Sequence, residues 1–85
     1  DLTEKLTLKI RKDYLELTSA WDAIQIAREQ KEYEEYLHEQ VRLNCENGYS
    51  TVADLLKSYS DLAKAEESYS TAVSDYITAL HAYLD

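Results

Sequence analysis

The chain has 85 residues, 45% of them hydrophobic and 31% charged, with a formal net charge of -8 and a pI of about 4.6. This length allows one domain with a shallow core, and the acidic charge disfavours binding to nucleic-acid phosphates or to anionic membrane surfaces. No apolar run approaches the roughly 18 residues that a membrane-spanning helix needs, and the single cysteine excludes an internal disulfide. Because the apolar pattern continues to both ends, we expect a fragment of a longer protein.

The first helix is expected over about residues 2–46. Its apolar residues recur at steps of three and four, which is the spacing of a coiled-coil seam. The members of this seam are Ile10, Tyr14, Leu17, Trp21 and Ile24. Beyond Ile24 the strict repeat falls on charged residues, and the apolar positions become Ile26, Tyr33, Leu37 and Val41. We expect this shift to rotate the seam around the helix, as a stutter does.

The turn is expected at residues 47–50, around the only glycine of a chain that contains no proline. Gly48 can end the first helix in a left-handed conformation, which costs a glycine nothing sterically. Ser50 or Thr51 can cap the second helix, with Asp54 in its first turn. A sharp reversal at this point predicts a helical hairpin.

The second helix is expected over about residues 51–84 and has the clearer pattern. Its seam consists of Val52, Leu55, Tyr59, Leu62, Glu66, Tyr69, Val73, Tyr76, Leu80 and Tyr83. Beside it runs a column of small residues, namely Ser58, Ala65, Ala72 and Ala79. We expect this column to admit a second neighbouring helix, because small side chains allow close approach.

A symmetric fold about the tip places residue i opposite roughly residue 97 minus i. Trp21 then faces Tyr76, and Lys31 faces Glu66, the one charged member of the second seam. The prediction is an all-α fold, a long antiparallel two-helix coiled-coil hairpin with helices about 50 to 65 Å long. Two helices cannot cover stripes this wide, so we expect self-association or a place in a larger α-helical barrel.

The tip and the residues around it also resemble a known family. The tip reads Asn47-Gly48-Tyr49-Ser50-Thr51, and Asp54 and Leu56 follow it. The pattern continues through Leu62, Ala65, Tyr69, Ala72, Asp75, Tyr76 and Leu80, and in the first half through Tyr14, Leu17, Trp21 and Ile24. This ungapped set resembles the TolC-type outer-membrane efflux proteins, and the second of their two repeats fits best.

The resemblance implies a function. In that family the hairpins build a trimeric periplasmic tunnel, and the glycine turn is the tip that engages an adaptor protein of a tripartite export pump. By position, the docking tip would be Asn47, Gly48, Tyr49, Ser50 and Thr51, and Asp54 would be a pore-lining residue. The parent would be a homotrimer in the outer membrane of a Gram-negative bacterium, with this chain in the periplasm, packed against neighbouring hairpins.

The sequence departs from that family at two positions near the tip. Cys45 stands where the family has a tyrosine, so a lock through that hydroxyl is absent. Lys57 stands where some members have a second acid, which puts a doubled carboxylate ring in doubt.

Simpler interpretations stand beside these. Gly48 can be a helix cap alone, Tyr49 an exposed loop aromatic, and Asp54 a partner of the helix dipole. Cys45 is expected in the seam, and His38 and His81 on the surface or its flanks. A hairpin offers no cleft for catalytic carboxylates, so we expect neither an enzyme nor a cofactor or metal. Two other functions remain open, the hairpin of a periplasmic adaptor protein and a cytosolic coiled-coil scaffold.

Overall fold

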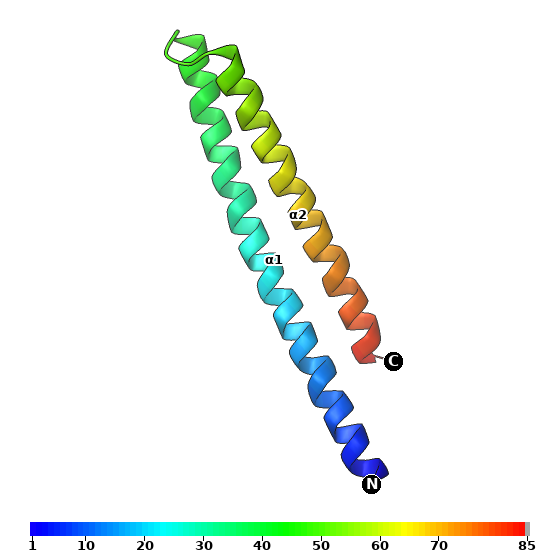
Figure 1. Ribbon diagram of the computed structural model, residues 1–85. Coiled ribbons are helices and arrows are strands. Elements are labelled where there is room, and N and C mark those ends of the chain that lie inside the picture. The colour runs from blue at the N-terminus through cyan, green and yellow to red at the C-terminus, as the bar shows by residue number, and fades with distance from the viewer. Residues whose placement is uncertain (85) are drawn as a thin grey trace.

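The computed structural model describes residues 1–84 and contains two helices, α1 (Leu2–Glu46) and α2 (Val52–Leu84), as Figure 1 shows. They lie side by side and antiparallel, and the Cα atoms span 69 × 14 × 13 Å. The expected all-α antiparallel hairpin is confirmed. Both helices begin and end within one residue of the ranges that the helix formers and the glycine turn predict.

Two aromatic contacts fix the register of the helices. The ring centroids of Trp21 and Tyr76 are 5.5 Å apart, and those of His38 and Tyr59 are 4.2 Å apart. The residue numbers add to 97 in both pairs, so the predicted register is confirmed. Since α1 has 45 residues and α2 has 33, the first dozen or so residues of α1 extend past the end of α2 (Figure 1).

The expected ion pair between Lys31 and Glu66 does not form, and that prediction was wrong. Lys31 Nζ lies 3.4 Å from Glu35 Oε1, one turn along its own helix, and 5.3 Å from the centroid of the Tyr69 ring. A lysine on the seam can lay its apolar stem along the neighbouring helix while its ammonium reaches the edge. The aromatic ring of Tyr69 and the carboxylate of Glu35 both stabilise the ammonium in that position.

The small-residue column of α2 faces α1 rather than a second neighbour, so its expected role was wrong. Ser58, Ala65 and Ala72 are buried, with 8%, 6% and 8% of their surfaces exposed. The closest approach of two helix backbones occurs where the side chains are smallest, so this column lies at the centre of the interface. Tyr59, which the sequence placed on the seam, lies at its edge with 57% of its surface exposed.

The shift of the seam expected in α1 is seen only in part, since Leu37 and Val41 are partly buried but Ile26 and Tyr33 are exposed. The seam keeps its strict repeat through Lys31 and His38, which are both partly buried. The apolar residues Ile26 and Tyr33, expected to take over the seam, are 68% and 55% exposed. The cause is the regular pattern of α2, which holds one stripe of α1 against it along the whole hairpin.

The core of the hairpin is thin. Within residues 1–84 the buried hydrophobic residues are Ile24, Ala65 and Ala72, and no large side chain is fully buried. Many large apolar side chains are instead exposed, among them Leu15 at 65% and Leu56 at 63%. Folding of this hairpin as a lone pair of helices therefore leaves much of its apolar surface in water.

Candidate functional site

The candidate site is the tip, and its first half is a Schellman motif at the end of α1. The Tyr49 N–H donates to the carbonyl of Asn44 at 2.7 Å, and the Gly48 N–H donates to the carbonyl of Cys45 at 3.2 Å. Gly48 has φ +81°, the left-handed conformation that this motif requires. The carbonyls of Leu43, Asn44 and Cys45 are thus satisfied within the tip itself.

The second half of the tip is a reciprocal capping box at the start of α2. The Asp54 N–H donates to Thr51 Oγ1 at 3.1 Å, and the Thr51 N–H donates to Asp54 Oδ2 at 3.2 Å. Thr51 is therefore the N-cap, and an aspartate takes the place that glutamate or glutamine fills in the common form of this motif. The two caps are joined by Ser50, whose N–H donates to the Asn44 carbonyl at 3.2 Å.

Within this framework the structure brings the predicted docking residues together on a short exposed turn. Tyr49 is the most exposed of the large hydrophobic residues, with 84% of its surface accessible. Asn47, Gly48 and Thr51 are also exposed, and Ser50 is partly buried. The fixed backbone beneath Tyr49 gives an aromatic side chain on a rigid support, which is a common form of binding anchor.

Asp54 is exposed, and its carboxylate has a local structural task. It holds the Thr51 N–H and lies in the first turn of α2, where a negative charge is favoured by the helix dipole. The simpler interpretation of Asp54 therefore accounts for its position. Only one oxygen of the Asp54 carboxylate takes part in the cap, so the negative charge remains at the surface. Lys57 and Asp61, in the next turns of α2, lie close to it.

Charged side chains on α1 beside the tip form a small network around Arg42. Its guanidinium contacts both oxygens of Glu39, with Nη2–Oε1 at 2.6 Å and Nε–Oε2 at 3.0 Å, and reaches Glu46 Oε1 at 2.6 Å. The hydrogen bond from Arg42 lowers the pKa of Glu39, and the same bond raises the pKa of Arg42. Glu39 and Glu46 are exposed and Arg42 is only partly buried, so the network orders side chains more than it stabilises the fold.

A polar cluster lies on the seam about two turns from the tip, and sequence reasoning missed it. His38, expected on the surface or flank, is partly buried, and its Nδ1 lies 2.9 Å from Ser58 Oγ. Ser58 Oγ donates its proton to the Leu55 carbonyl at 2.8 Å, so His38 Nδ1–H donates to Ser58. The signal was present in the spacing, because His38 continues the seven-residue column of Leu17, Ile24 and Lys31. The arrangement satisfies two polar groups inside the interface.

Other features of the described residues bear on the function classes. No helix in residues 1–84 is long and apolar enough to cross a membrane. The same residues hold no group of three or more His, Cys, Asp or Glu side chains placed to bind a metal ion. Cys45 is partly buried at the end of α1, as a member of the seam, and is a free thiol.

The comparisons with known proteins identify no family. No family model matches the chain, and neither a curated protein nor a solved structure shows significant similarity to it.

Proposed function

We propose that the chain is a periplasmic segment of an outer-membrane efflux channel, whose tip docks an adaptor protein of a tripartite export pump. The proposal rests on the resemblance of the spaced residues to the TolC-type family. The observation that carries it furthest is the exposed Tyr49 on a turn closed by hydrogen bonds on both sides. Such a turn loses little conformational entropy when a partner binds, because its backbone is already ordered.

The mechanism is mechanical rather than chemical. The two long helices form a stiff rod that ends in a small recognition surface. That surface consists of Asn47, Gly48, Tyr49, Ser50 and Thr51. In the tunnel, hairpins of this kind pack side by side, and docking at the tips shifts the balance between closed and open arrangements. Asp54, at the first turn behind the tip, would place a negative charge near the entrance of such a conduit.

The test is a binding measurement on the tip. The chain is immobilised through its end opposite the tip and exposed to purified periplasmic adaptor proteins encoded in its source genome. We expect Tyr49→Asp to abolish adaptor binding while helicity by circular dichroism stays unchanged. Tyr36→Asp is the matched control, because Tyr36 is also exposed, at 61%, but lies on α1 away from the tip.

Three results would contradict the proposal. The first is absence of binding to every adaptor tested. The second is equal binding by wild type and Tyr49→Asp, which removes Tyr49 from the interface. The third is equal loss in the two variants, which assigns docking to the helices instead of the tip.

A further inference from the structure

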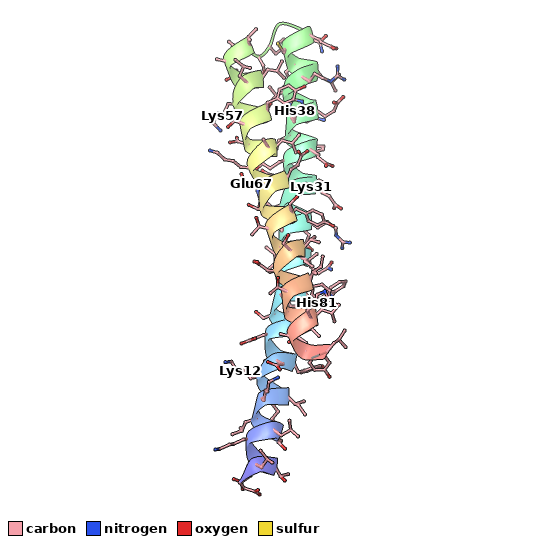
Figure 2. The ribbon with its side chains drawn as sticks, turned by 90° about the vertical axis from the view of Figure 1, so that its right-hand side faces the viewer. Lys12, Lys31, His38, Lys57, Glu67 and His81 are labelled. Atoms are coloured by element: carbon pink, nitrogen blue, oxygen red, sulfur yellow. The ribbon has the colours of Figure 1, made fainter. Side chains whose placement is uncertain are left out.

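We draw no further inference here: the strongest candidate, the shallow groove along the side of the hairpin to which Lys12 and Lys57 point (Figure 2), is lined by small and acidic residues such as Ala65, Ser68 and Asp61, and nothing in the structure shows what covers it.

Discussion

The tip of this hairpin and its two paired helices, here called the shaft, differ in how far each region is stabilised by its own residues. At the tip, five residues between the helices close a Schellman motif and a capping box, which give local partners to the Asn44 and Cys45 carbonyls and to the Thr51 and Asp54 amides. Along the shaft, residues 1–84 bury three hydrophobic residues and leave many large apolar side chains exposed. The difference indicates that local hydrogen bonds specify the turn, whereas the packing of the two helices leaves much of their apolar surface uncovered.

The largest effect is expected from a charge placed on the small-residue column. Ala65→Asp puts a carboxylate at a position that is 6% exposed, which should cost more than about 3 kcal/mol and abolish the cooperative thermal transition. Ala63→Asp makes the same change at an exposed position of α2 and should retain the transition. If both variants melt like wild type, the small column is not at the centre of the interface.

The next effect is expected at Gly48, where the cost is entirely in the backbone. A Cβ built there meets no atom within 4 Å, but φ +81° is strained for a β-branched residue. Gly48→Val should destabilise the hairpin by about 2 kcal/mol, and Gly48→Asn by clearly less, because asparagine tolerates the left-handed region. Chemical denaturation of both variants measures this difference. Equal stability of Gly48→Val and wild type would contradict the left-handed cap.

A smaller effect is expected from the capping box. Thr51→Ala removes the oxygen that accepts from the Asp54 N–H and should cost about 1 kcal/mol, while Thr51→Ser keeps the oxygen and should stay near wild type. Amide exchange at Asp54 is the most direct readout. Unchanged protection of that amide in Thr51→Ala would mean that another group caps α2.

The smallest effect is a pH dependence at the end of α1. Because Arg42 lowers the pKa of Glu39 below its ordinary value of 4.5, the pair contributes fully above that pH and is lost as the pH falls through the lowered value. The protection factors of the amides near residue 46, corrected for the intrinsic pH dependence of exchange, should therefore fall modestly below pH 4.5, and Arg42→Gln should remove that change. An identical pH profile in the variant would assign the effect to other carboxylates.

Much of the fold was predictable because the boundaries of the helices are clearly marked in the sequence. A lone glycine between two long runs of helix formers fixes the turn, and symmetry about it gives the register seen in the Trp21–Tyr76 contact. The seam of α1 was harder to predict, because hydrophobicity alone placed Ile26 and Tyr33 on it. The regular spacing of α2 imposes Lys31 and His38 instead, and this constraint is visible only when the two helices are considered together.

The small-residue column of α2 shows the same limit of a prediction that considers one helix at a time. The seven-residue spacing of the column was recognised, but the helix that it faces was not. Small residues allow close approach either of the other helix in the same chain or of a helix from another chain. At the tip, the cap at Gly48 and the candidates for the N-cap were predictable from local chemistry. The choice of Thr51 over Ser50 depends on which hydroxyl reaches the Asp54 amide, which the sequence leaves open.

The most direct test of the central contrast between tip and shaft is the dependence of the thermal unfolding midpoint on protein concentration. If the shaft is completed by a second copy, the midpoint should rise steadily as the concentration increases from about one to several hundred micromolar, because association stabilises the folded state by mass action. A midpoint that stays constant across this range, with a monomeric mass throughout, would show that the hairpin is complete by itself and would contradict this account.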